Sequence, residues 1–242
     1  SAIVLLALIP IMRYRKKNVR IDPVDSEPKK RVSLKDIPGF FKQPKIGRRV
    51  ILLVMFYSGI VGILAMLKPY LVDLGYSIKE IAFITGIFGT AFGAGSAFLG
   101  GHIMRKIGNK KALQIFTGYG TLAAVYVAAL TTVDPALPLL YVGVALIWSA
   151  YGMCAVGVYT ISMNTTRKGT EGTDYTLQIV LTHLSSILVV VLSGRIGEWL
   201  GYTGLFAVEA ALGLTVTLLI RKLYHDPEIG VQSEIALQRK SA

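Results

Sequence analysis

The sequence predicts an all-α protein that spans a membrane as a polytopic bundle of six transmembrane helices. Its 242 residues are 53% hydrophobic and only 17% charged, and the mean hydropathy of +0.57 is too high for an ordinary soluble domain. The apolar residues form runs of about 20, the length that crosses a hydrocarbon core of about 30 Å. Lys and Arg lie in blocks between these runs, which argues against nucleic-acid binding despite a net charge of +12.

Other classes of protein are excluded by the same composition. Disorder requires low hydrophobicity, and a disulfide-stapled fold requires more than the single Cys154. The sequence contains no H-E-x-x-H, no G-x-S-x-G and no His, Cys and Asp cluster with metal-ligand spacing. We therefore expect neither an enzyme nor a protein with a bound cofactor or metal.

Residues 1–12 form an apolar stretch that is followed at once by basic residues, beginning with Arg13. Twelve residues cover roughly 18 Å as a helix, too little to cross a bilayer. A secretory signal peptide has its positive charges before the apolar region, the reverse of this order. We expect the end of a truncated preceding helix here, and a missing N-terminal half of the same polypeptide.

Residues 13–49 are predicted to be a polar central linker, because charges and two prolines interrupt any apolar period. The transmembrane bundle is predicted over 50–223, and a polar C-terminal tail over 224–242. Within the bundle every span must be helical, since lipid leaves the backbone to satisfy its own hydrogen bonds. The expected spans are 50–71, 81–104, 112–131, 137–163, 175–196 and 202–223.

The basic residues also predict the orientation of the bundle. The segments 13–49, 105–111, 167–168 and the part after Ile220 hold 23 of the 26 Lys and Arg residues. Positive charge is retained on the cytoplasmic side of short loops. These segments and the C-terminus are therefore predicted to be cytoplasmic.

Small residues recur every four positions in the second span, at Gly89, Gly93, Ala97 and Gly101. They form one stripe of the helix, against which a neighbouring backbone can pack closely. A sliding surface between moving helices would use the same stripe, and both interpretations remain open.

The loop after this span reads Gly101-His-Ile-Met-Arg105-Lys106-Ile-Gly108-Asn-Lys110-Lys111. It resembles the conserved cytoplasmic loop of the major facilitator superfamily, and Gly101, Lys106, Gly108, Lys110 and Lys111 match its pattern. Arg105 stands where that family has Asp, so the carboxylate latch of the family loop is in doubt. Gly108 also permits the positive φ that so short a reversal needs.

This resemblance implies one six-helix half of a twelve-helix secondary transporter, which works by alternating access and draws on a proton gradient, as a symporter. Lys68-Pro69-Tyr70-Leu71 and the segment from Gly172 to Gln178 resemble siderophore carriers of the pyochelin and rhizobactin type, and more distantly muropeptide permeases and acetyl-CoA transporters. The implied cargo is an iron-siderophore or a similar small or medium-sized solute at a bacterial inner membrane. The implied partners are the lipid bilayer, a small-molecule substrate and the missing half, with no nucleic acid.

Polar and aromatic residues inside the spans are the candidates for the substrate pathway. His183 lies near the membrane midplane and titrates near neutral pH, although a simple helix-to-helix hydrogen bond is the more frequent case. Gln178, Thr182 and Ser185 form a stripe that either lines water or bonds a neighbouring helix. Trp148 and Tyr151 are spaced to form an aromatic wall or simple packing. The predicted pathway residues are Tyr57, Lys68, Trp148, Tyr151, Gln178, Thr182 and His183; the predicted gating loop is Gly101, Arg105, Lys106, Gly108, Lys110 and Lys111.

A different class remains possible, a membrane-embedded structural or accessory subunit that transports nothing. In that case the polar residues would only hold helices together. We also expect Glu209, seven residues into the last span, to find a partner on another helix rather than to bind cargo.

Overall fold

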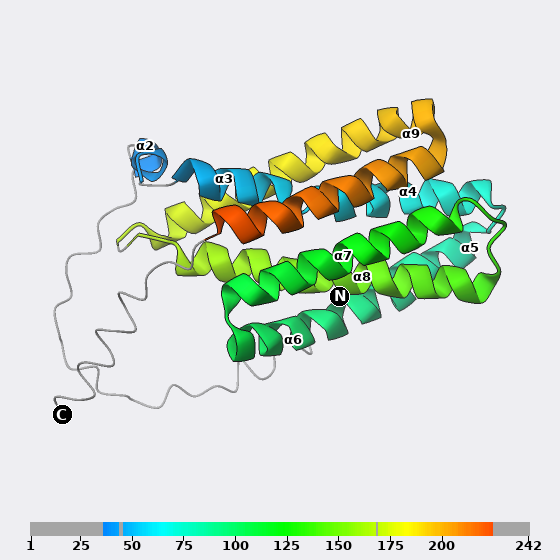
Figure 1. Cartoon of the computed structure of the whole chain (residues 1–242), viewed down its shortest axis with the longest axis horizontal. Helices are drawn as coiled ribbons and strands as arrows, with labels where there is room; N and C mark the ends of the chain where they lie inside the picture. The colour runs from blue at the N-terminus through cyan, green and yellow to red at the C-terminus, as the bar shows by residue number, and fades with distance from the viewer. Residues whose placement is uncertain (1–35, 44–45, 168, 225–242) are drawn as a thin grey trace. The chain divides into compact units, whose positions relative to one another are not determined.

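The structure, a computed structural model, describes residues 36–43, 46–167 and 169–224. The expectations for residues 1–12, for most of the linker 13–49 and for the tail after Tyr224 lie outside the described residues. In the described part, every regular element is a helix (Figure 1), which confirms the all-α fold. The helices are α2 (Asp36–Phe41), α3 (Ile46–Met55), α4 (Ser58–Asp73), α5 (Ile78–Ile81), the π-helix η1 (Ala82–Phe88), α6 (Gly89–Ile107), α7 (Asn109–Leu130), α8 (Leu137–Asn164) and α9 (Glu171–Leu223).

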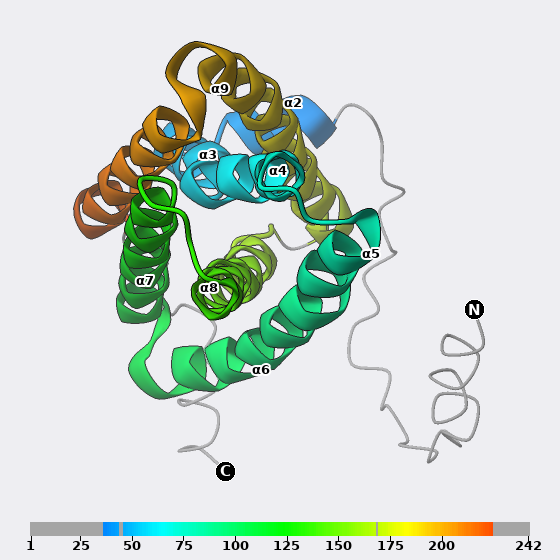
Figure 2. The ribbon, with the colours of Figure 1, turned by 90° about the vertical axis from the view of Figure 1, so that its right-hand side faces the viewer.

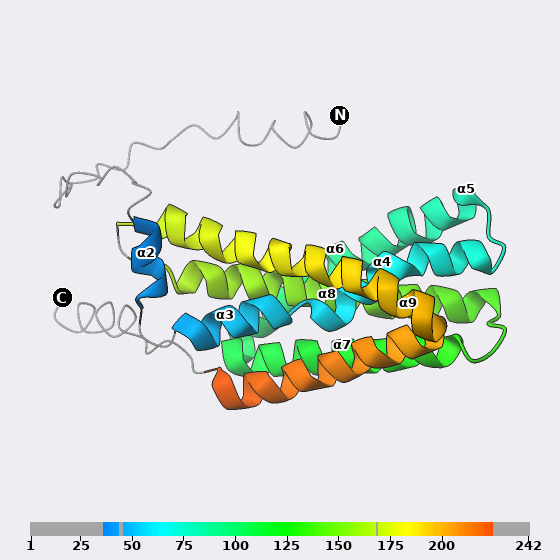
Figure 3. The ribbon, with the colours of Figure 1, turned by 90° about the horizontal axis from the view of Figure 1, so that it is seen from above.

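Five stretches of the described chain are long and apolar enough to cross a membrane: Ile46–Asp73, Ile78–Ile107, Asn109–Leu130, Leu137–Asn164 and Glu171–Leu223. The last is α9, whose 53 residues are broken at Gly201, where φ is 65°. Figures 1 and 3 show the chain turning back at this end of the bundle. We call residues 171–200 the first arm and residues 202–223 the second arm of α9. The two arms correspond to the predicted fifth and sixth spans, so the bundle has six crossings.

The centre of the bundle is α8. Viewed along the helices, it lies inside the ring of the others (Figure 2), and it contacts α4, α6, α7 and α9. Its buried residues include small ones, Gly143, Ala150 and Gly152, which allow close approach of its neighbours. The first arm of α9 contacts α3 through Ser185 and α4 through Ser193. The second arm also packs on α4, at Gly59, and runs beside α7, as Figure 3 shows.

The first span is not one continuous helix, which corrects the expectation for 50–71. The helix stops at Met55 and restarts at Ser58, with Phe56 and Tyr57 in a turn between α3 and α4. The second span also departs from a plain α-helix, because Ala82–Phe88 is a π-helix. The break in the first span falls within its apolar run, where non-helical backbone is tolerated only when protein or a water-filled cavity surrounds it.

The outer surface of the bundle is strongly apolar. Phe98 on α6 is 81% exposed, and Ile87, Leu122, Ile187 and Leu188 are also exposed on their helices. A soluble protein rarely exposes so much contiguous apolar surface. Lipid is the solvent that this surface fits, and the chain is an integral membrane protein.

Candidate functional site

Three of the predicted pathway residues meet at the break between α3 and α4. The rings of Tyr57 and Tyr151 have centroids 5.6 Å apart, and those of Trp148 and Tyr151 lie 5.9 Å apart in an edge-to-face arrangement. Tyr57 is buried, whereas Trp148 and Tyr151 on α8 are half-buried. We call these three residues the aromatic cluster. Aromatic pairs at such distances stabilise one another beyond the area that they bury.

Trp148 packs against the glycine stripe of the second span. A Cβ atom at Gly89 would lie 2.5 Å from the Trp148 indole, and one at Gly93 would lie 3.3 Å from it. On the other side of the contact, a Cβ at Gly152 of α8 would lie 2.1 Å from the carbonyl oxygen of Gly93. The close packing of α6 on α8 that the stripe predicts is therefore present.

The indole N–H of Trp148 is buried and has no hydrogen-bond partner among the residues that the structure describes. Tryptophan N–H groups usually find a partner when buried. The indole lies against Gly89, which leaves no room for a side chain at that position.

The break in the first span is closed by serine side chains. Ser58 Oγ donates to the carbonyl oxygen of Met55 at 2.6 Å, and Ser185 Oγ on α9 donates to that of Val54. These carbonyls lie at the end of α3, where intrahelical partners run out. Ser185 therefore connects the first arm of α9 to the broken helix.

The polar stripe of the fifth span bonds neighbouring helices. Gln178 is fully buried; its Nε2 donates to the carbonyl oxygen of Ser162 at 3.1 Å, and its Oε1 accepts from Thr165 Oγ1 at 3.0 Å. Thr182 is buried and donates to the carbonyl oxygen of Gln178 at 2.9 Å. Of the two interpretations of the stripe, the structure favours the helix contact, and the pathway role of Gln178 and Thr182 stays a prediction.

Lys68 and His183 lie apart from the aromatic cluster. Lys68 is exposed near the end of α4, one turn before the exposed carboxylate-bearing residue Asp73 and its partner Tyr202. His183 is exposed on the first arm of α9, on a face that it shares with Val180, Leu184 and Ile187. Neither side chain lies with the other pathway candidates in this structure.

The residues of the predicted gating loop lie at the ends of α6 and α7, and only Gly108 lies between the two helices. Gly108 stands alone between Ile107 and Asn109, with φ of 82°, which only glycine adopts at little cost. Arg105, Lys106 and Lys111 are exposed around it, Lys110 and Gly101 are half-buried, and Arg105 approaches His102 Nδ1 at 3.5 Å. The positive φ expected at Gly108 is confirmed.

An ion pair that the sequence did not predict lies between α8 and α9. Asp174 is fully buried; Arg167 Nη2 donates to its Oδ1 at 2.6 Å, and Arg167 Nε donates to its Oδ2 at 2.8 Å. The backbone N–H of Arg167 adds a third bond, at 3.0 Å. Arg49 Nη1 on α3 donates to the nearby carbonyl oxygen of Thr165 at 3.1 Å. This polar layer joins one end of α3, α8 and α9.

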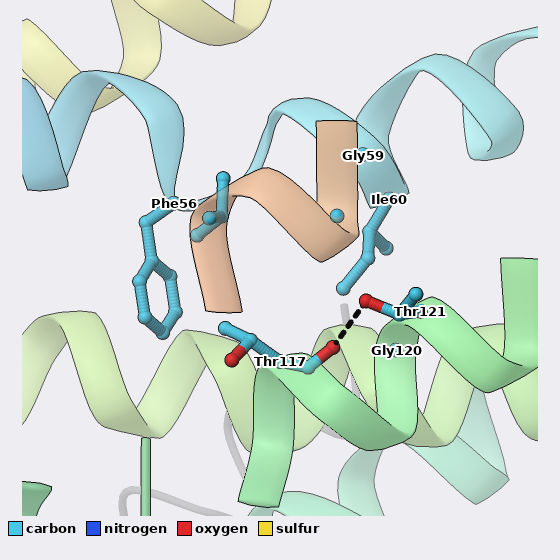
Figure 4. A pocket seen from close by; sticks show the side chains of 8 residues that line it. Phe56, Gly59, Ile60, Thr117, Gly120 and Thr121 are labelled. Atoms are coloured by element: carbon cyan, nitrogen blue, oxygen red, sulfur yellow. Dashed lines mark hydrogen bonds between the residues drawn. The ribbon is translucent and has the colours of Figure 1, made fainter. Parts of the chain in front are cut away.

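A small pocket lies where α4, α7 and the second arm of α9 meet (Figure 4), and one of its lining residues, Phe56, packs edge-to-face on Tyr57 of the aromatic cluster at 6.0 Å. In its wall, Thr121 Oγ1 donates to the carbonyl oxygen of Thr117 at 2.9 Å, within α7. No predicted pathway residue contributes to it. The pocket is lined by Phe56, Gly59, Ile60, Thr117, Gly120, Thr121, Gly213 and Val216.

The sequence also missed an extension of the aromatic cluster along α8. Tyr141 is half-buried and Tyr159 exposed, and with Trp148 and Tyr151 they lie at spacings close to whole helical turns. Tyr159 lies 18 positions after Tyr141, which covers about 27 Å as a helix, most of a hydrocarbon core. Phe88 of η1 packs edge-to-face on Tyr141 at 4.9 Å. The helical spacing was the available signal.

A bundle of apolar crossings, with a broken first span and aromatic side chains along its central helix, defines a polytopic membrane protein. Residues 1–180 match the family described as Major Facilitator Superfamily, and the chain belongs to this superfamily.

Two curated relatives are similar to about three quarters of this chain. The chain is 26% identical over 185 residues to the "Putative transporter AmpG 4" of Rickettsia felis, and 25% identical to the protein of the same name from Rickettsia conorii. Each alignment covers 76% of this chain but 44% of the relative. The chain therefore spans less than half the length of these relatives.

Proposed function

We propose that this chain forms one six-helix half of a secondary active transporter, which works by alternating access against a second half of similar architecture. Membership of the superfamily supports transport, and the alignment over 44% of the relatives is consistent with half of a longer protein. The proposed location is a bacterial inner membrane, with the turn at Gly108 and the C-terminus in the cytoplasm.

The observation that carries this proposal is the aromatic cluster beside the break between α3 and α4. Broken helices at membrane depth typically line a substrate cavity in transporters. In the described part of the chain, the hydroxyl groups of Tyr57 and Tyr151 have no hydrogen-bond partner, so each can donate to or accept from a polar solute that enters the cluster. The flat rings offer a surface for an apolar or ring-containing part of the cargo.

For the cargo we propose an iron-siderophore of medium size, taken up with protons. Lys68, exposed near the end of α4, supplies a positive charge for an anionic chelate. The two matching relatives are named as transporters without a siderophore, so a muropeptide-type or acyl-CoA-type solute of the same superfamily is the second candidate.

Uptake by the full-length protein, with Trp148→Ala as the variant, tests the proposal. If the cluster contacts cargo, uptake falls at least about tenfold, the loss expected when one stacking contact worth about 1.4 kcal/mol disappears. The matched control is Trp199→Ala, because Trp199 lies on α9, is 79% exposed and is not part of the aromatic cluster. Protein abundance is measured in both variants.

Two results would contradict the proposal. Unchanged uptake in Trp148→Ala removes the aromatic cluster from the pathway. An equal loss of abundance and uptake favours the structural-subunit interpretation. Parallel assays with ferric pyochelin and with a muropeptide separate the two cargo candidates.

A further inference from the structure

The carboxyl group of Glu209 is buried where three helical segments meet. Glu209 lies on the second arm of α9 and is 1% exposed, and its Oε1 is 2.6 Å from Ser193 Oγ on the first arm. On the third side is α4, where a Cβ at Gly62 would lie 1.7 Å from Glu209 Oε1 and 2.4 Å from Ser193 Oγ. The expectation that Glu209 finds a helix partner is confirmed.

The hydroxyl proton of Ser193 cannot serve both of its neighbours. Ser193 Oγ is 2.8 Å from the carbonyl oxygen of Val189 and 2.6 Å from Glu209 Oε1. A serine hydroxyl has one proton and can accept further bonds. Both short distances are hydrogen bonds only if Ser193 donates its proton to the Val189 carbonyl and accepts a proton from the carboxyl group of Glu209.

The surroundings of the carboxyl contain no positive charge to stabilise an anion. Glu209 Oε2 is buried and has no hydrogen-bond partner among the described residues, and no cation pairs with Glu209 there. From α4 it meets Gly62, and from the first arm Ser193, while α7 is without charged residues from Ala112 to Leu130. Lys68 of α4 and Arg195 of the first arm, the nearest basic residues along their helices, are exposed. An unpaired carboxylate is costly at this depth, whereas a neutral acid leaves only a carbonyl-like oxygen unbonded.

We infer that Glu209 is a proton-binding site within the membrane and that the site is occupied here: the neutral acid donates its proton to Ser193, and α4 packs on the pair at Gly62. The site lies outside the aromatic cluster and does not depend on the identity of the cargo. An anion could keep only the Ser193 hydroxyl as a donor, and only at the expense of the bond to Val189, so loss of the proton weakens the contact between the two arms of α9. The ligand of the site is a proton.

Infrared difference spectroscopy of the full-length protein in lipid at neutral pH tests this inference. The C=O stretching band of a protonated carboxylic acid is expected in the wild type and is lost in Glu209→Gln. The matched control is Glu198→Gln, since Glu198 is exposed on the first arm. It should leave the band unchanged.

A second variant keeps the test decisive if Glu209→Gln does not fold. Ser193→Ala removes the acceptor of the acid proton, so the band is expected to shift to higher frequency without disappearing. The inference is overturned if the wild type shows no such band at neutral pH, or if the band persists in Glu209→Gln.

Discussion

Single side chains on α8 and α9 decide how the ends of the bundle are held. The carboxylate of Asp174 is satisfied by three donors from Arg167, and the fully buried Gln178 lies one turn further along the same helix. Tyr202, the first residue of the second arm, donates to the carboxylate of Asp73 on α4. Polar contacts thus lie at the start of the first arm and just beyond its end, while its middle is apolar on its exposed side.

Removal of the charge at Asp174 is expected to destabilise the protein. Breaking a buried ion pair costs roughly 3–5 kcal/mol, and since Arg167 is 31% exposed we expect about 2–3 kcal/mol for Asp174→Asn. Thermal unfolding of the purified full-length protein in detergent measures the change. Glu171→Gln, a change at an exposed residue of the same turn, should leave the melting temperature unaltered. Equal melting temperatures for Asp174→Asn and wild type would show that the pair contributes no stability.

The break between α3 and α4 depends on a hydrogen bond from another helix, which Ser185 of α9 supplies. Because Ser185→Ala removes the donor to the carbonyl of Val54 at the end of α3, we expect the free energy of unfolding to fall by about 1–2 kcal/mol. The neighbouring Ser186 bonds only the carbonyl of Thr182 within its own helix, at 3.0 Å. Ser186→Ala is therefore the matched control, with an expected change within about 0.5 kcal/mol. If both variants unfold alike, Ser185 does not support the break.

The contact between α6 and α8 is set by backbone rather than by flexible side chains. A Cβ at Gly152 would lie 2.1 Å from the Gly93 carbonyl oxygen, so Gly152→Ala must push the two helices apart. We expect a destabilisation of about 1–3 kcal/mol. Gly95→Ala on α6 is the control, because nothing lies within 4 Å of the added methyl group. A melting temperature of Gly152→Ala equal to that of Gly95→Ala would contradict the packing described here.

The sequence predicts the crossings well because lipid imposes a single requirement on each of them. Runs of apolar residues must be helical, and the bounds of α7 and α8 fall within a few residues of the predicted spans. Gly108 was predicted as a positive-φ reversal, since a four-residue basic turn leaves room for little else. The break at Phe56 and Tyr57 was not predicted, because neither proline nor glycine marks it and its bonds come from residues as distant as Ser185.

The candidate site was only partly predictable for a related reason. Sequence spacing places Trp148 and Tyr151 on one side of a helix, and their contact with Tyr57 follows from how α4 and α8 pack. The rotation of the first arm of α9 is not fixed by its sequence, because the arm is apolar on most of its circumference. His183, predicted to lie near the membrane midplane, is exposed on the first arm, and its role in the pathway stays a prediction.

For the molecule as a whole, the alternation of its connections predicts which ends share a compartment. Cys154 is the single cysteine of these 242 residues and is buried, so this part of the protein should not react with a membrane-impermeant thiol reagent. Lys106→Cys, beside the turn at Gly108, should be labelled only from the cytoplasmic side. Asp134→Cys, in the exposed connection after α7, should be labelled only from the opposite side. Labelling of both from one side would overturn the proposed topology.

The turn at Gly108 has a mechanical consequence. One residue joins the ends of α6 and α7, so the Cα atoms on either side of it are tethered by two virtual bonds of about 3.8 Å. A slide of one helix past the other by a full turn, about 5.4 Å, would strain this tether or unwind a helix end. The longer connection after α7 has slack that this one lacks. A displacement of α6 along its axis is therefore transmitted to α7 at that end, and the two helix ends move together.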